Sequence, residues 1–297
     1  MKTPKRIEPL IEDGLVDEVL RPLMSGKEAA VYVVRCGKEL RCAKVYKEAN
    51  KRSFRQAAEY QEGRKVRNSR QARAMAKGSK FGRKETEDAW QNAEVAALFR
   101  LASAGVRVPK PFDFLDGVLL MEMVCDEYGD AAPRLNDVTL EPDQAREYHA
   151  FLIQQIVLML CTGLVHGDLS EFNVLLSPDG PVIIDLPQAV DAAGNNHAFS
   201  MLERDVGNMA SYFGRFAPEL KETRFAREMW SYYEAGTLSP MTVLTGNFGE
   251  PDDVADVNSV LREIEAAQRD EARRQAARNA DDAPASKEEE PPPPWMQ

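Results

Sequence analysis

Four polar residues are spaced along the segment GLVHGDLSEFNVLLSPDGPVIIDLPQAV, residues 163–190, in a way that could serve chemistry: His166, Asp168, Asn173 and Asp185. Asp168 and Asn173 lie five positions apart in a stretch that we expect to be a loop after a buried helix. Asp185 ends the second strand of a predicted hairpin, NVLL-SPDG-PVIID, whose four-residue turn would bring Asn173 and Asp185 to the same end of the strand pair. Two oxygen-donating side chains at that place suit Mg²⁺.

The order of these residues carries more information than any one of them. A single Asp or Asn of this kind would more often cap a turn or end a strand. An H-x-D-x-x-x-x-N pattern followed by a strand-end Asp, however, has the spacing of a protein-kinase catalytic loop and its metal-binding residue. Asp168 would then orient or deprotonate a hydroxyl group, whereas His166 is expected to brace the loop backbone.

Lys44 lies in RCAKVYK, a predicted strand that otherwise alternates small and apolar residues. A lysine there should reach into a cleft and neutralise phosphate charge, and it would need an orienting carboxylate. Glu94, in the middle of a predicted helix among alanines, is the best candidate. The alternative is a surface lysine and a solvent-facing glutamate.

Two further segments are weaker signals for a nucleotide. LMSGKEAAVYVV, residues 23–34, could bring backbone N–H groups close to phosphates, but Gly26 is its sole glycine, so the segment fits neither G-x-G-x-x-G nor Walker A. In LLMEMV, residues 119–124, the Glu122 carbonyl and the Val124 N–H would meet an adenine edge. That expectation depends on position alone.

The predicted elements follow a two-lobed α+β plan, with a polar linker, residues 125–137, at a natural cleft. We expect an N-lobe over residues 1–124, a C-lobe over residues 125–267 and a disordered charged, Pro-rich tail over residues 268–297. The predicted elements are helices over 4–20, 86–104 (closed by Gly105), 142–162, 199–215 and 219–234, a hairpin over 29–46, and a hairpin over 108–124 that turns at Asp116-Gly117.

Composition predicts a cytoplasmic protein with reduced cysteines. Of the 297 residues, 43% are apolar and 29% charged. No apolar run approaches the ~18 residues of a membrane span and no secretory signal is apparent, so we expect no membrane contact. The four cysteines show no CxxC spacing, which argues against a zinc site: Cys36, Cys42, Cys125 and Cys161.

The net charge of −10 conceals a basic block. Residues 47–84 hold thirteen lysines and arginines against three glutamates. We expect a flexible loop there that could meet a ribosomal or other nucleic-acid polyanion.

Taken together, SGKEAAVY, APRLNDV, HGDLSEFNVLL, IIDLPQAV and ERDVGNM closely resemble motifs of the RIO family of atypical serine/threonine protein kinases, over roughly residues 5–235. The resemblance implies a bilobal protein-kinase-like fold, with a small antiparallel N-lobe sheet and a mainly helical C-lobe, that lacks a full activation segment. The chain departs from many members at Gly167, at Leu186-Pro187 and in the length of the basic loop.

Carried over position by position, the resemblance implies ATP and Mg²⁺ as cofactors, with Mn²⁺ as a substitute. Asp168 would be the catalytic base, and Asn173 and Asp185 would hold the metal. Lys44 would bind phosphates and pair with Glu94. The residues expected to cover the phosphates or to meet adenine are Ser25, Gly26, Lys27, Glu28, Ala29, Val31, Glu122 and Val124.

Some members of the family are thought to act as ATPases through an aspartyl-phosphate at the metal-loop Asp, here Asp185. The flexible loop of the family often carries autophosphorylation serines, for which Ser53, Ser69 and Ser79 are the candidates here.

Three functions follow. The leading one is an ATP- and Mg²⁺-dependent serine/threonine kinase that can phosphorylate itself, with a protein substrate that the sequence does not define. The second is a small-molecule kinase of the aminoglycoside or choline type, which also uses an H-G-D…N…D pattern. The third is an ATP-gated factor that binds a ribonucleoprotein, as in ribosome assembly, through the basic loop.

Overall fold

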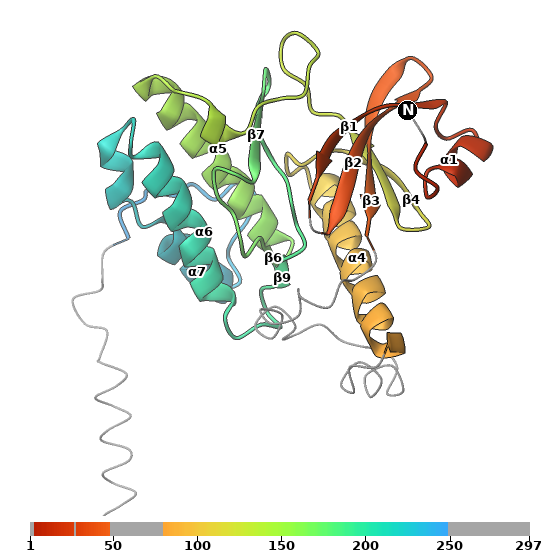
Figure 1. The fold of residues 1–297 in the computed structure, drawn as a ribbon. Helices are drawn as coiled ribbons and strands as arrows, with labels where there is room; N and C mark the ends of the chain where they lie inside the picture. Colours follow the sequence, from red (N-terminus) through yellow and green to blue (C-terminus); the bar gives the residue numbers. More distant parts are fainter. Residues whose placement is uncertain (1–2, 27, 48–79, 249–297) are drawn as a thin grey trace, which may run out of the picture. The chain divides into compact units, whose positions relative to one another are not determined.

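A five-stranded antiparallel sheet with the strand order β1-β2-β3-β5-β4 forms the first half of the chain (Figure 1). The computed structural model describes residues 3–26, 28–47 and 80–248, with side chains omitted for residues 80–90. The described residues all belong to one unit that ends at Phe248. The strands are β1 Glu18–Ser25, β2 Ala29–Cys36, β3 Glu39–Tyr46, β4 Pro111–Leu115 and β5 Val118–Glu122.

The two faces of this sheet have different partners, because successive side chains of a strand point to opposite sides. Ala43 and Val45 of β3 pack with Ile7 and Leu10 of the short helix α1, Glu8–Glu12. Cys42, Lys44 and Tyr46 alternate with them and therefore face the other way. Their cross-strand partners on β2 and β5 share that second face: Val33, Val31, Ala29, Met121 and Leu119.

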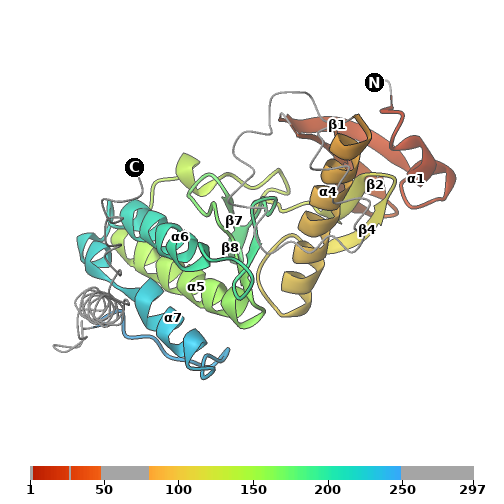
Figure 2. The ribbon, with the colours of Figure 1, turned by 90° about the horizontal axis from the view of Figure 1, so that it is seen from below.

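Helix α4, Lys80–Ser103, lies alongside this second face (Figures 1 and 2). It ends where Gly105 takes a positive φ of 82°, with the Val106 N–H bonded to the Leu101 carbonyl and the Gly105 N–H to the Ala102 carbonyl. This pattern is a Schellman motif, which glycine closes without steric cost. The helix thus ends at the predicted glycine.

Helices α5 Pro142–Cys161, α6 Ala198–Phe213 and α7 Phe225–Glu234 make up most of the second half, side by side in both views (Figures 1 and 2). The other elements there are the pairs β6 Leu164–Val165 with β9 Val190–Asp191 and β7 Val174–Ser177 with β8 Gly180–Ile183, and the 3₁₀ turns η1 Leu135–Asp137 and η2 Pro218–Glu222. One apolar cluster joins Leu98 and Leu101 of α4 to Leu152, Ile156 and Leu160 of α5. The two lobes therefore share their main core.

The backbone of Arg107 also crosses between the lobes. Its N–H donates to Oε1 of Gln155 on α5 at 2.7 Å, and its carbonyl accepts the Ile183 N–H of β8 at 2.9 Å. Gln155 is almost fully buried. The lobes are thus tied behind the cleft as well as through the predicted linker.

The fold class is confirmed, but several element boundaries differ. The predicted helix over 4–20 is wrong beyond Glu12, because the chain turns at Gly14 (φ 71°) and Glu18–Ser25 join the sheet as its edge strand β1. The hairpin over 29–46 is confirmed. So is the turn at Asp116-Gly117, where both residues have the positive φ of a type I′ turn (48° and 74°).

Two predictions in the second half also needed correction. Ser177 pairs with Gly180, so the third hairpin turns through two residues, not four. The helix predicted over 219–234 is split, because Thr223 is extended between η2 and α7. Most of the basic block and the whole predicted tail lie outside the described residues. No helix in the described part of the chain is long and apolar enough to cross a membrane.

His149 of α5 gives the C-lobe a pH-dependent stability. It is 2% exposed and packs against the rings of Phe213 and Phe225, and its Nε2 makes no hydrogen bond with the described residues. Burial lowers the pKa of His149 from 6.5 to about 4. The unfolded chain therefore takes up this proton at a higher pH than the folded chain.

Stability should accordingly fall as the pH falls from 6.5 towards 4, by up to about 1.4 kcal/mol per pH unit from this group. We expect His149→Leu to remove that component from the free energy of unfolding, measured by urea titration at several pH values. The exposed His197→Gln should retain the slope. An unchanged slope in His149→Leu would contradict the assignment.

Candidate active site

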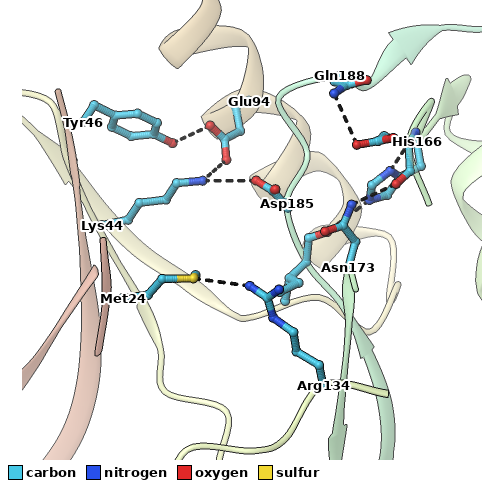
Figure 3. A network of polar contacts seen from close by, with 11 residues as sticks. Met24, Lys44, Tyr46, Glu94, Arg134, His166, Asn173, Asp185 and Gln188 are labelled. Carbon is cyan, nitrogen blue, oxygen red and sulfur yellow. Dashed lines mark hydrogen bonds and ion pairs between the residues drawn. The ribbon is translucent and has the colours of Figure 1, made fainter. Parts of the chain in front are cut away.

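A buried carboxylate organises the sheet side of the cleft (Figure 3). Lys44 Nζ donates to Glu94 Oε1 at 2.5 Å, and the Tyr46 hydroxyl donates to Glu94 Oε2 at 2.8 Å. Glu94 is 7% exposed, and its two donors come from alternate residues of one strand. The structure thus brings together the predicted pair, Lys44 and Glu94, and adds Tyr46, which sequence reasoning missed although its i+2 spacing from Lys44 was visible.

The ionisation of these groups follows from their burial and charges. Burial lowers the pKa of Lys44, but the carboxylates of Glu94 and Asp185 outweigh it and leave the pKa above its ordinary value. Burial and then Glu94 raise the pKa of Tyr46. Lys44 therefore stays a cation and Tyr46 a hydrogen-bond donor at neutral pH.

Asp185 faces Lys44 from the other lobe, with Oδ1 3.7 Å from Nζ and its side chain about half exposed. Its φ of 67° lies in the left-handed region, which a non-glycine residue adopts rarely and Asp more readily than most. Such backbone strain is found mainly where a side chain must be aimed at a ligand. Lys44 is therefore in ionic contact with carboxylates of both lobes.

Asp205 of α6 holds the predicted catalytic loop, HGDLSEFN, residues 166–173. The N–H groups of Gly167 and Leu169 donate to its two carboxylate oxygens at 2.8 and 2.9 Å, and Asp205 is 1% exposed. Arg204 donates to the Gly167 carbonyl, and Asn208 donates to the Leu169 carbonyl at 2.9 Å. Both peptide groups around Asp168 are held, while the Asp168 side chain stays exposed. The signal for this clamp was ERDVGNM, to which sequence reasoning gave no role.

His166 joins the catalytic loop to the predicted metal loop, IIDLPQAV, residues 183–190. Asp168 N–H donates to His166 Nδ1 at 3.3 Å, so Nε2 carries the ring proton and donates to the Ile184 carbonyl at 3.1 Å. His166 is 2% exposed, and Val165 before it pairs with Val190. This is a bracing geometry, as expected for His166.

Asn173 and Gln188 bond to Asp168 from opposite sides. Asn173 Nδ2 donates to the Asp168 carbonyl at 2.8 Å, which directs its amide oxygen elsewhere, and Gln188 Nε2 donates to Asp168 Oδ2 at 3.2 Å. Burial raises the pKa of Asp168, with Asp185 adding to the shift and His166 and Arg204 opposing it.

The turn between β1 and β2 holds the residues predicted to cover phosphates. Gly26 N–H bonds to the Ala29 carbonyl at 2.9 Å, and Lys47 Nζ donates to Ser25 Oγ at 2.9 Å and to the Gly26 carbonyl at 2.6 Å. Val31 pairs with Lys44 in the sheet. The carboxylate of Glu28 also helps to raise the pKa of Lys44. Lys27 lies outside the described residues.

At the end of β5 the side chains of the predicted adenine-contacting residues have structural partners. Glu122 forms a two-pronged ion pair with Arg107 at 2.8 and 2.9 Å. Burial acts to raise the pKa of Glu122, but the hydrogen bonds from Arg107 and from the Lys110 N–H lower it overall. Val124 is buried with Ala132 and Val182. An adenine contact would thus use their backbone, and that contact stays a prediction.

Arg134 in the linker was also missed. Its side chain lies across the cleft from Lys44 (Figure 3). Its Nη2 lies 3.3 Å from Sδ of Met24, which is on β1 in the same sheet as Lys44. An antiparallel bridge between Arg134 and Leu175 holds the backbone there. The segment APRLND therefore places the Arg134 guanidinium beside β1, the strand that leads into the turn predicted to cover the phosphates (the phosphate turn).

The donor set fits a divalent cation held together with a nucleotide. The described residues contain no group of three or more His, Cys, Asp or Glu side chains that could hold a metal by themselves. The carboxylate of Asp185 and the amide oxygen of Asn173 are hard oxygen donors, and Mg²⁺ is commonly held by one or two such groups plus substrate phosphates. A small antiparallel sheet, a helical lobe and this cleft together define a protein-kinase-like phosphotransferase.

Comparisons with known proteins give the family. The model of the RIO domain matches residues 30–226. The RIO-type serine/threonine-protein kinase Rio1 of Haloferax volcanii is 37% identical over 215 residues, which cover 70% of this chain and 68% of that protein. The serine/threonine-protein kinase rio1 of Schizosaccharomyces pombe is 30% identical over 69% of this chain and 40% of its own length, and human RIO1 is 30% identical over 72% and 36%.

This chain belongs to the RIO family of serine/threonine-protein kinases. Its enzyme class is therefore that of the protein kinases, which use ATP and a divalent metal. The chain spans well under half of the length of the two eukaryotic relatives.

Asp205 offers a test of the loop clamp. Asp205→Asn keeps the shape but turns an NH₂ group towards one of the two backbone N–H donors, so one buried donor loses its acceptor, at a cost of about 1–3 kcal/mol. We expect kcat to fall roughly 10- to 100-fold while nucleotide binding, measured by calorimetry, changes little. Asp143→Asn, whose side chain is 97% exposed, is the matched control. Wild-type kcat in a folded Asp205→Asn protein would refute the clamp.

Proposed function

We propose that this protein transfers the γ-phosphoryl group of ATP to serine or threonine hydroxyls, with Mg²⁺ as the metal. The observation that carries the proposal is the double engagement of Lys44, which contacts Glu94 at 2.5 Å and Asp185 at 3.7 Å across the cleft. A cation held between the lobes and next to a strained, exposed carboxylate is suited to a triphosphate and its metal.

Each residue has a defined task in this transfer. Lys44 neutralises phosphate charge, and Asn173 and Asp185 would hold the metal, which would offset the charge that develops on the phosphate oxygens. Asp168 accepts the proton of the attacking hydroxyl. The new bond joins the hydroxyl oxygen to the γ-phosphorus, and the bond to the β–γ bridging oxygen breaks as ADP leaves. Positioning and charge neutralisation account for most of the rate.

The acceptor is the open part of the proposal. Autophosphorylation would use Ser53, Ser69 or Ser79, all outside the described residues. Alternatively, Asp185 itself could accept the phosphoryl group, and hydrolysis of that aspartyl-phosphate would make the protein an ATPase. The family comparison favours protein kinases over a small-molecule kinase of the aminoglycoside or choline type.

Asp168→Ala should reduce phosphoryl transfer from labelled ATP by about 10²–10⁴-fold, because the hydroxyl loses its proton acceptor, while ATP affinity stays close to that of the wild type. Mass spectrometry of the wild-type product should place the label on serine or threonine, or on Asp185 if ATP hydrolysis dominates. Asp179→Ala, in the exposed hairpin turn, is the control. Near-normal transfer by Asp168→Ala would sink the assignment of the base.

A second function is favoured by the charge of residues 47–84, which carry thirteen basic residues and three glutamates. We propose that this block binds an RNA-like polyanion. Lys47 connects it to the nucleotide cleft, since its ammonium group bonds to Ser25 and to the Gly26 carbonyl. Such contact could couple polyanion binding to the phosphate turn.

Replacing residues 50–79 by a short Gly-Ser linker would remove most of the block and leave α4 intact. We expect binding to homopolymeric RNA to fall steeply with salt in the wild type, as counterion release requires, and to be lost in the replacement. Fluorescence anisotropy at several salt concentrations measures both. Salt-insensitive binding, or equal binding by the two proteins, would argue against this role.

A further inference from the structure

Gln188 contacts the carboxylate that removes the proton in the proposed reaction. Its Nε2 lies 3.2 Å from Asp168 Oδ2. An ionised carboxylate can accept hydrogen bonds but not donate them, so the NH₂ group of the glutamine must face it. In the sequence Gln188 served as a family marker and received no task.

We propose that Gln188 is a positioning residue that fixes the orientation of the Asp168 carboxylate for proton removal. The inference deepens the proposed function and rests on Asp168 being the base. It assigns Oδ2 of Asp168 to the glutamine and leaves Oδ1 for the substrate hydroxyl.

The need for such a residue follows from how Asp168 is held. Its N–H bonds to His166 Nδ1 and its carbonyl accepts from Asn173, so the backbone is fixed. Its side chain is exposed, and the terminal torsion of an aspartate has a broad energy minimum. Within the described residues, the hydrogen bond from Gln188 is the one that reaches this carboxylate.

Gln188 itself extends from a rigid turn. Leu186 and Ala189 are 2% and 8% exposed and belong to the main apolar core, and the Ala189 N–H bonds to the Leu186 carbonyl at 3.0 Å. Val190 then pairs with Val165 just before the catalytic loop. Core packing and strand pairing therefore fix the backbone from which the half-buried Gln188 side chain reaches Asp168.

The location of Gln188 couples two functions in one short segment. It lies three residues after Asp185, and only residues 186–197 separate Asp185 from the start of α6. The hydrogen-bond donor to the Asp168 carboxylate thus comes from the segment that begins with Asp185. A shift of Asp185 would therefore also displace the donor to Asp168.

Two variants of Gln188 test the role, one that removes the side chain and one that keeps its shape. Gln188→Ala removes the donor, and we expect kcat to fall roughly tenfold, which is the usual effect of losing one hydrogen bond to a charged group. KM for ATP should stay within about twofold. Gln188→Glu keeps the shape but offers no donor at neutral pH, so its kcat should fall at least as far. Gln154→Ala, which removes an amide bonded to the Pro240 carbonyl, should change neither constant.

A double-mutant cycle with Asp168→Ala separates positioning from other roles. If Gln188 acts through Asp168, Gln188→Ala should add no further loss of transfer in the Asp168→Ala background, measured with labelled ATP over long incubations. An equal loss in both backgrounds, or a raised KM with unchanged kcat, would overturn the inference. Full activity of Asp168→Ala would instead refute the part of the proposed function on which the inference rests, the assignment of Asp168 as the base, so the two failures can be told apart.

Discussion

The carboxylate of Asp205, buried beneath the catalytic loop, is the constraint on which the site depends. A charge at 1% exposure is costly unless it is hydrogen-bonded, and here it accepts two backbone N–H groups that flank Asp168. Burial raises the pKa of Asp205, and those bonds together with His166 and Arg204 oppose the rise. Because neighbouring α6 residues such as Met201 and Met209 belong to the main core, the loop inherits its position from the packing of the C-lobe.

A buried, hydrogen-bonded carboxylate also organises the N-lobe. Glu94 is buried, and both of its oxygens have donors on β3. Its helix contributes Leu98 and Leu101 to the core that α5 completes, and Arg107 ties the lobes a second time. Lys44 is thus held by a buried carboxylate whose helix packs in the shared core. This packing places the Lys44 ammonium group 3.7 Å from the Asp185 carboxylate.

The loops between these supports are short and linked to one another. His166 bonds to the Ile184 carbonyl, and Gln188 bonds to the Asp168 carboxylate. Strand β6, just before His166, pairs with β9, just after Gln188. These contacts are local in space but come from segments about twenty residues apart. They explain why few residues after Asp185 suffice to close the site.

Much of this protein could be predicted from its sequence, because the signals were local. The residues proposed as the catalytic base and the metal ligands lie within residues 163–190 at fixed spacing, the turn at Asp116-Gly117 has its own dipeptide signature, and Gly105 ended its helix as predicted. Failures came where a neighbour decided the structure. Val19 and Leu20 continue the apolar spacing of the helix predicted over 4–20, but β2 offered an unpaired edge, and pairing with it made them part of strand β1.

The sequence by itself therefore determined the family, the α+β class and the residues that could do chemistry, since these depend on residue type and on spacing along the chain. Only the tertiary structure decided that Asp205, Tyr46, Gln188 and Arg134 take part. Each acts through a partner that lies 20 to 110 positions away along the chain. A side-chain hydrogen bond depends on distance in space, which spacing along a chain does not specify, so these roles became visible only once the core had placed α6, β3 and the metal loop around the cleft.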